Sequence, residues 1–117
     1  MTETYTPDNL MDPTFPHISG QETILTGNNL TRGTVLGKVT ASGKCVAVDD
    51  SNSDGSQTAY AILAEDTDAT SADKTAPVFL VGHFNENELT FGDDDDIDDH
   101  RATLRDIGIY TTAWSPA

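Results

Sequence analysis

The chain is 117 residues long and carries 20 acidic against 6 basic side chains, which gives a formal net charge of −14 at pH 7. This balance argues against nucleic acid and anionic membrane surfaces as direct partners, because both are bound mainly through Lys and Arg. Only 36 % of the residues are hydrophobic, so the composition predicts a single domain with one modest core, which assembly with further copies would help to stabilise.

Residues 1–20 combine prolines with large apolar side chains. The prolines exclude a continuous helix or a central strand and favour extended backbone; they are Pro7, Pro13 and Pro16. The large apolar side chains are more frequent than in a typical disordered tail, and they are Tyr5, Leu10, Met11, Phe15 and Ile18. We therefore expect either a flexible tail or an extended arm that becomes ordered when its apolar side chains bind a partner.

The middle of the chain has the alternation and the turn residues of short β-strands. Residues 34–39 and 44–48 flank a turn at 40–43, in which Gly43 can adopt a positive φ. This arrangement predicts a β-hairpin. Apolar runs of strand length predict further strands at 59–64 and 76–81, and a short strand is expected at 88–91.

One helix is predicted near the C-terminus, where side chains recur at three- and four-residue spacing: Ile97, Arg101, Leu104 and Ile107. Gly108 follows at the position of a C-terminal cap, and the aspartates of 93–99 place negative charge near the helix N-terminus, where the helix dipole favours it. We predict a mainly β (α+β) fold, either barrel-like or a β-sandwich, with one short helix. Residues 1–20 form the extended arm and residues 21–117 the β-rich domain.

The sequence contains no pattern that predicts catalysis. Residues 50–55 match the first half of a calcium loop, but Ala61 replaces the acid needed at its twelfth position. The acidic run 93–99 would attract hard cations only loosely. Cys45, the only cysteine, lies in a predicted strand without neighbours that would activate its thiol. No zinc spacing, nucleophile motif or phosphate-binding loop is present. We expect no enzyme, no metal site and no cofactor.

Four stretches of the chain resemble segments of the head decoration proteins of tailed bacteriophages, of the lambda head protein D type. They are 30–37, then 54–55 with 59–66, then 76–78, and finally 82–85. The resemblance implies a compact, mainly β trimer that sits at three-fold positions of an icosahedral capsid and touches the major capsid protein. It also implies that the N-terminal arm reaches the shell. The aspartate-rich stretch 93–99 departs from the family pattern.

From this resemblance the chain is expected to be a decoration protein that binds the expanded head and stabilises it. The candidate capsid-binding residues are Tyr5, Leu10, Met11, Phe15, Ile18 and Arg32. Arg32 either pairs with an acid of the capsid or of a neighbouring subunit, or is a solvated surface cation. The N-terminus lacks the features of a secretory signal and no apolar run is long enough to span a membrane. We therefore expect synthesis in the host cytoplasm and a final location on the outer capsid surface of the virion.

Two other functions remain open at this point. One is a different adaptor of the virion, associated with the tail or a fibre. The other is a β-barrel module that binds a small ligand or a carbohydrate. Neither alternative predicts that the protein binds expanded capsids.

Overall fold

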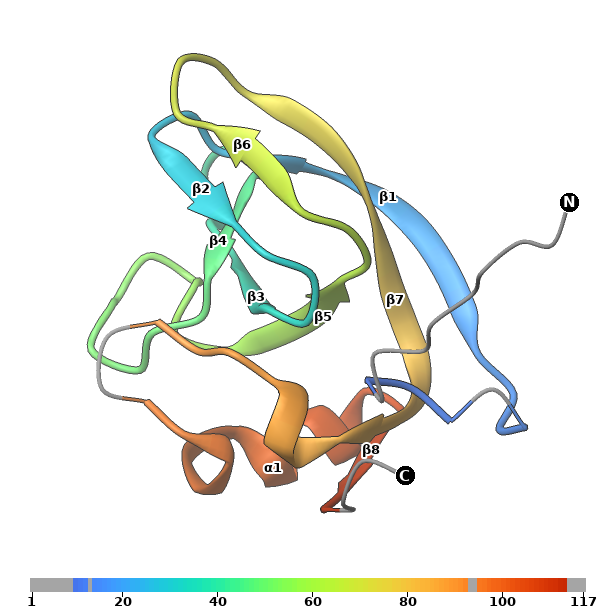
Figure 1. Cartoon of the computed structure of the whole chain (residues 1–117). Helices are drawn as coiled ribbons and strands as arrows, with labels where there is room; N and C mark the ends of the chain where they lie inside the picture. The colour runs from blue at the N-terminus through green and yellow to red at the C-terminus, as the bar shows by residue number, and fades with distance from the viewer. Residues whose placement is uncertain (1–9, 13, 93–94, 114–117) are drawn as a thin grey trace, which may run out of the picture.

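The computed structural model describes residues 10–12, 14–92 and 95–113. A closed five-strand β-barrel forms its centre (Figure 1). In order around the barrel, the strands are β1 (Ile18–Ile24), β4 (Cys45–Ala47), β3 (Val35–Lys38), β5 (Ala59–Leu63) and β7 (Lys74–Asn85). The barrel closes because β7 also pairs with β1, in antiparallel register from Ile18 opposite Val81 to Ile24 opposite Lys74.

The remaining elements lie against this barrel. Strands β2 (Asn28–Leu30) and β6 (Thr67–Ala69) form a separate two-stranded sheet. A short 3-10 helix, η1 (Glu86–Glu88), follows β7, and after it come helix α1 (Ile97–Asp106) and strand β8 (Ile109–Thr112). Strands account for 44 % of the described residues, which confirms the predicted mainly β fold and selects the barrel over the sandwich.

The predicted hairpin is present as β3 and β4, which pair in antiparallel register. Gly43 has a φ of 72° in the connecting turn, so glycine is needed there to avoid the steric cost that other residues meet at positive φ. Its backbone N–H donates to the Val39 carbonyl at 2.7 Å. The strands predicted at 59–64 and 76–81 correspond to β5 and to the middle of the longer β7.

The prediction of a strand at 88–91 is wrong. The chain instead forms η1, in which the side-chain oxygen of Asn85 accepts a hydrogen bond from the Asn87 backbone N–H at 3.1 Å. Only Thr90 makes a strand-like contact, an isolated parallel bridge with Thr34. Asparagine at the start of this segment offers the backbone a local partner, which favours a capped turn over a strand ladder.

Helix α1 confirms the prediction made from its periodicity. Asp96 is the N-terminal cap and forms a capping box with Asp99, and Gly108 follows the helix with a φ of 94°. The inward face of the helix buries His100 and Leu104. Helix α1 has only 10 residues, and no helix of the described residues is long and apolar enough to cross a membrane.

Buried side chains form two clusters on opposite sides of the sheet. One cluster joins β1, β3, β4 and β5 to β6 and the first half of β7, with Ile24, Leu36, Cys45, Leu63 and Val78 among its members. The other joins the sheet to α1 and β8, and its largest residues include Leu10, Ile62, Phe84, Leu104 and Ile109. The second cluster fixes β8 beside β7 in parallel register, Gly82–Asn85 opposite Ile109–Thr112.

Part of the predicted arm lies within this domain. Leu10 is only 2 % exposed and belongs to the second cluster, and Met11 forms an antiparallel bridge with Phe84. Strand β1 already begins at Ile18. The described part of the predicted arm, from Leu10 onward, therefore packs on the domain. Residues 1–9, including Tyr5, lie outside the described residues.

Candidate functional site

The end of β7 carries a surface of apolar and aromatic side chains. Ile18 of β1 is opposite Val81 of β7, and Tyr110 of β8 is opposite His83 of β7. Val81 and His83 are two residues apart on one strand, so their side chains point to the same side of the sheet. Ile18 and Tyr110 are 58 % and 44 % exposed, respectively. Together with Phe15, the residues Ile18, Val81, His83 and Tyr110 are called the outer face below.

Phe15 joins this face from the segment before β1. Its ring lies edge-on to the His83 ring and to the Tyr110 ring, with 5.8 Å between centroids in both cases. Aromatic rings favour such edge-to-face contacts, so the three rings form one packed group. The outer face thus collects two of the described large exposed hydrophobic side chains, the third being Ile107 just beyond α1.

Backbone and side-chain hydrogen bonds hold the segment that carries Phe15. The Asn85 N–H donates to the Leu10 carbonyl at 2.8 Å, and the Asp12 N–H donates to the His83 carbonyl at 2.9 Å. The Asp12 carboxylate accepts from the backbone N–H of Thr14 at 2.9 Å and from its hydroxyl at 2.6 Å. The hydroxyl contact is the main reason that the pKa of Asp12 lies below its usual value. Asp12 is therefore ionised at neutral pH.

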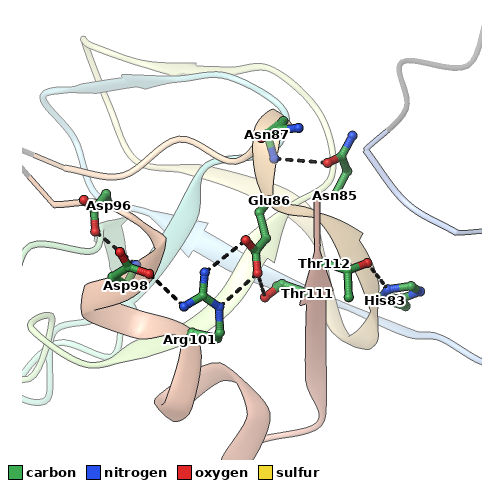
Figure 2. Close-up of polar contacts among 9 residues, drawn as sticks. All are labelled: His83, Asn85, Glu86, Asn87, Asp96, Asp98, Arg101, Thr111 and Thr112. Atoms are coloured by element: carbon green, nitrogen blue, oxygen red, sulfur yellow. Dashed lines mark hydrogen bonds and ion pairs between the residues drawn. The ribbon is translucent and has the colours of Figure 1, made fainter. Parts of the chain in front are cut away.

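A second polar group fixes β8 to the rest of the domain (Figure 2). The Arg101 guanidinium donates to both Glu86 carboxylate oxygens at 3.0 Å, and the Thr111 hydroxyl donates to the same carboxylate at 2.9 Å. Hydrogen bonding by Arg101 is the largest cause that lowers the pKa of Glu86 and keeps it charged. Because the three residues come from η1, α1 and β8, the group holds the strand that presents Tyr110.

Arg32 does not project freely from the domain. Its Nη1 donates to the Ala64 carbonyl at 2.7 Å, and its guanidinium carbon lies 5.6 Å from the centroid of the Phe79 ring. Its backbone N–H donates to the Asp66 carboxylate at 2.8 Å. Arg32 thus stabilises the connection between β2 and β3 in the described domain, and its pairing with an acid of another protein stays a prediction.

The structure brings together only some of the predicted site residues. Phe15 and Ile18 share the outer face, Met11 lies half-buried beside β7, and Leu10 is buried in the core. Sequence reasoning missed His83 and Tyr110. Tyr110 lies in a short run of strand-forming residues, Ile109–Thr112, but the parallel pairing of β8 with β7, which places Tyr110 opposite His83, has no local sequence signal.

Three carboxylates near the start of α1 have the chemistry to hold a cation. Ligand oxygens of Asp49, Asp50 and Asp95 lie within 4.8 Å of one another. Asp95 already accepts hydrogen bonds from His100 Nε2 at 2.6 Å and from the Asp50 backbone N–H at 2.8 Å. The Asp49 carboxylate accepts from the Ser51 backbone at 2.9 Å. These internal bonds explain the arrangement without an ion.

Two other features carry side chains that could react or bind a ligand, the thiol of Cys45 and a groove beside Lys38, and interactions within the domain account for both. Cys45 is buried, and this burial raises the pKa of its thiol to about 11. The thiol is therefore protonated at neutral pH, which agrees with the prediction of an unreactive cysteine. An open groove of about 340 Å³ is lined in part by Lys38 and Tyr60. Lys38 Nζ lies 3.2 Å from the Glu22 carboxylate and 3.2 Å from the Tyr60 hydroxyl, which itself donates to Glu22 at 3.0 Å. The charge of this groove is thus balanced within the domain.

Comparison with known protein families gives a match over residues 2–109 to the family described as bacteriophage lambda head decoration protein D. The matched span includes the barrel, α1, and the outer-face residues from Phe15 to His83. Tyr110 lies one position beyond its end. No curated protein is found to match the chain.

Proposed function

The chain belongs to the bacteriophage lambda head decoration protein D family, and we propose that it binds expanded icosahedral heads as a homotrimer at their three-fold positions and stabilises the shell. The family is a structural one of the phage capsid, so its role is decoration of the head and its place is the virion. The direct partner proposed here is the major capsid protein, and synthesis is proposed to occur in the host cytoplasm.

The outer face is the observation that supports a capsid contact on this domain. It exposes Ile18 and Tyr110 in a chain whose net charge is −14. Exposed apolar side chains that gather on one face of a soluble protein mark interaction surfaces. About half of each of these two side chains is already buried, so burying the rest would contribute on the order of 1 kcal/mol each before ordering costs. The face also lies beside Leu10, where the chain continues into residues 1–9.

Residues 1–9 extend the proposed contact. Tyr5 is the one candidate capsid-binding residue that precedes Leu10 in the sequence. Pro7 keeps this segment from forming a helix and lowers the entropy lost when it orders on a partner. We propose that residues 1–9 and the outer face bind the capsid together, and that the apolar contacts include Tyr5, Phe15, Ile18 and Tyr110.

Trimerisation would increase the retention of such a modest contact. A trimer that binds through three equivalent faces converts the second and third binding events into intramolecular ones, so that weak contacts combine into a long-lived attachment. The retention would hold neighbouring capsid subunits together, which is the physical meaning of shell stabilisation proposed here.

Cosedimentation with undecorated expanded heads of the virus that encodes the chain tests this function. We expect the wild-type protein to pellet with the heads and an Ile18→Thr, Tyr110→Thr double variant to bind at least about tenfold more weakly, since each lost apolar contact is worth about 1 kcal/mol or more. Asn29→Thr, at the exposed middle position of β2, is the control and should bind like the wild type. A wild-type protein that stays in the supernatant would contradict the proposal and favour a tail or fibre adaptor or a ligand-binding module.

A further inference from the structure

The imidazole of His83 lies between two polar groups from segments far apart in the sequence. Its Nδ1 is 3.2 Å from the Asp12 carboxylate, and its Nε2 is 2.8 Å from the Thr112 hydroxyl, a contact that Figure 2 shows at the end of β8. Both ring nitrogens therefore have a partner, and the ring connects the segment before β1 to β8. The two partners come from opposite ends of the described chain.

Asp12 links the His83 contact to Phe15 through the turn that contains both Asp12 and Phe15. The Phe15 backbone N–H donates to the Asp12 carbonyl at 3.2 Å, and the Asp12 carboxylate binds Thr14 within the same turn. The position of Asp12 thus fixes the turn, and the turn places the Phe15 ring against the rings of His83 and Tyr110. Without the His83 contact, the side chain of Asp12 would be held only by its own turn.

The stability of the domain does not require this contact. The His83 and Asp12 side chains are 23 % and 31 % exposed, and ion pairs or hydrogen bonds with that much solvent access contribute little to folding. Leu10 and Met11 are already anchored by burial and by bonds to β7. What the contact determines is the path of the chain after Met11 and the place of Phe15 on the outer face.

We propose that Asp12, His83 and Thr112 form a clasp that holds the turn of residues 12–15 on the outer face, with His83 as a positioning residue for the capsid contact. This inference rests on the proposed function. The two hydrogen bonds that the imidazole makes, with the Asp12 carboxylate and the Thr112 hydroxyl, keep the Phe15 ring where a capsid protein would meet it. Phe15 then does not have to become ordered on binding.

Three variants test the clasp in the full chain. His83→Phe keeps a ring beside Phe15 but loses both hydrogen bonds. His83→Asn has an amide nitrogen close to the position of Nδ1 and can still reach Asp12. Thr112→Val removes the second partner at an exposed position on β8, where unfolding of the core is not expected. His17→Asn is the control, because His17 is exposed in the same segment and its ring lies beside Phe79 rather than Asp12.

Amide hydrogen exchange in the free protein is the first measurement. We expect the Phe15 amide to exchange about fivefold faster in His83→Phe, as loss of one partly exposed polar contact permits. Thr112→Val should show a smaller increase, while His83→Asn and His17→Asn should stay near the wild-type rate. The Val78 amide in the barrel should not change in any variant. Unchanged exchange at Phe15 in both His83→Phe and Thr112→Val would overturn the clasp.

Binding to undecorated heads is the second measurement. Affinity should fall about fivefold in His83→Phe and recover in His83→Asn, while the melting temperature stays close to that of the wild type. If His83→Phe binds heads as tightly as the wild type, the positioning role is overturned. If the wild type itself does not bind heads, the proposed function fails, and the exchange rate at Phe15 then decides separately whether the clasp holds the turn.

Discussion

Leu10 shows how one residue can change the interpretation of a whole segment. Its sequence context, between Pro7 and Pro13, indicates an extended arm. In the structure its side chain is 2 % exposed and packs in the cluster that includes Phe84 and Leu104. Burying a leucine of this kind contributes about 1.5–3 kcal/mol, and the backbone hydrogen bonds of Leu10 and Asp12 to β7 add to this against an ordering entropy of about 1–2 kcal/mol per residue. The domain therefore retains the segment from Leu10 onward.

We predict that Leu10→Ala lowers the free energy of unfolding by about 2–5 kcal/mol, because it removes buried methyl groups and leaves a cavity. Chemical denaturation of the free protein measures the change. Ile18→Thr serves as a comparison at a position that is 58 % exposed, and its effect should stay within about 0.5 kcal/mol. Equal effects of the two substitutions would show that Leu10 is not part of the core in solution.

Glu86 provides a prediction on pH dependence. The Arg101 guanidinium holds the pKa of Glu86 below its usual value of 4.5 in the folded protein. A carboxyl group with a lowered pKa stabilises the fold above its unfolded pKa and loses that contribution as the pH falls through the folded pKa. The Glu86 contribution should therefore be complete at neutral pH and disappear at acidic pH, below 4.5.

The variant Glu86→Gln isolates this contribution. At pH 7 we expect it to be less stable than the wild type by about 1 kcal/mol, the usual scale for a charged hydrogen bond that is partly exposed on one side. The stability difference should shrink as the pH is lowered, and denaturation curves across the acidic range would measure it. A difference that stays constant with pH would mean that the carboxylate charge is not what Arg101 and Thr111 recognise.

At the scale of the elements, local patterns were sufficient for the hairpin and the helix. Gly43 between two alternating runs predicted β3 and β4, and the periodicity from Ile97 to Leu104 predicted α1. Both elements depend on residues close together in the sequence. The outer face depends on contacts between residues far apart in the sequence, Phe15 with Tyr110 and Ile18 with Val81. The sequence therefore predicts Phe15 and Ile18 as site residues but not the surface to which they belong. Such pairings have no signature in a single sequence.

The effect of an N-terminal truncation on stability depends on whether it removes Leu10 and the start of strand β1. Deleting residues 1–9 removes Tyr5 and leaves Leu10 in place, so we expect a folded domain whose melting temperature is close to that of the full chain. Deleting residues 1–19 removes Leu10 and the start of β1, which pairs with β7, and should lower the melting temperature strongly. Thermal unfolding of both truncated proteins measures this difference.

The same pair of truncations refines the binding prediction. The shorter deletion should weaken attachment to expanded heads without changing the fold, which assigns a share of binding to residues 1–9. If the chain lacking residues 1–19 is as stable as the one lacking 1–9, the packing of Leu10 and the β1–β7 pairing do not carry the stability argued here. The sequence is compatible with a flexible tail or a partner-binding arm over residues 1–20, and the burial of Leu10 is the reason for comparing deletions that end on either side of it.

At the scale of the whole molecule, charge opposes assembly. Each copy carries a net charge of −14 on a body that measures 42 × 34 × 24 Å. Carboxylates concentrate near the start of α1, where Asp96, Asp98 and Asp99 follow Asp95. Copies brought together in a trimer repel one another, and this repulsion is long-ranged at low ionic strength, where the Debye length is about 30 Å at 0.01 M salt.

We therefore predict that trimer formation in the free protein increases with salt. At about 1 M salt the Debye length falls to about 3 Å, so repulsion between copies is screened while burial of apolar surface at the interface is retained. Multi-angle light scattering at a series of NaCl concentrations should show the mass moving from that of the 12.5 kDa monomer toward three times that value. The Asn29→Thr control should follow the same curve. A monomer mass at every salt and protein concentration would mean that the trimer does not form before docking, and that the capsid itself must bring the three copies together.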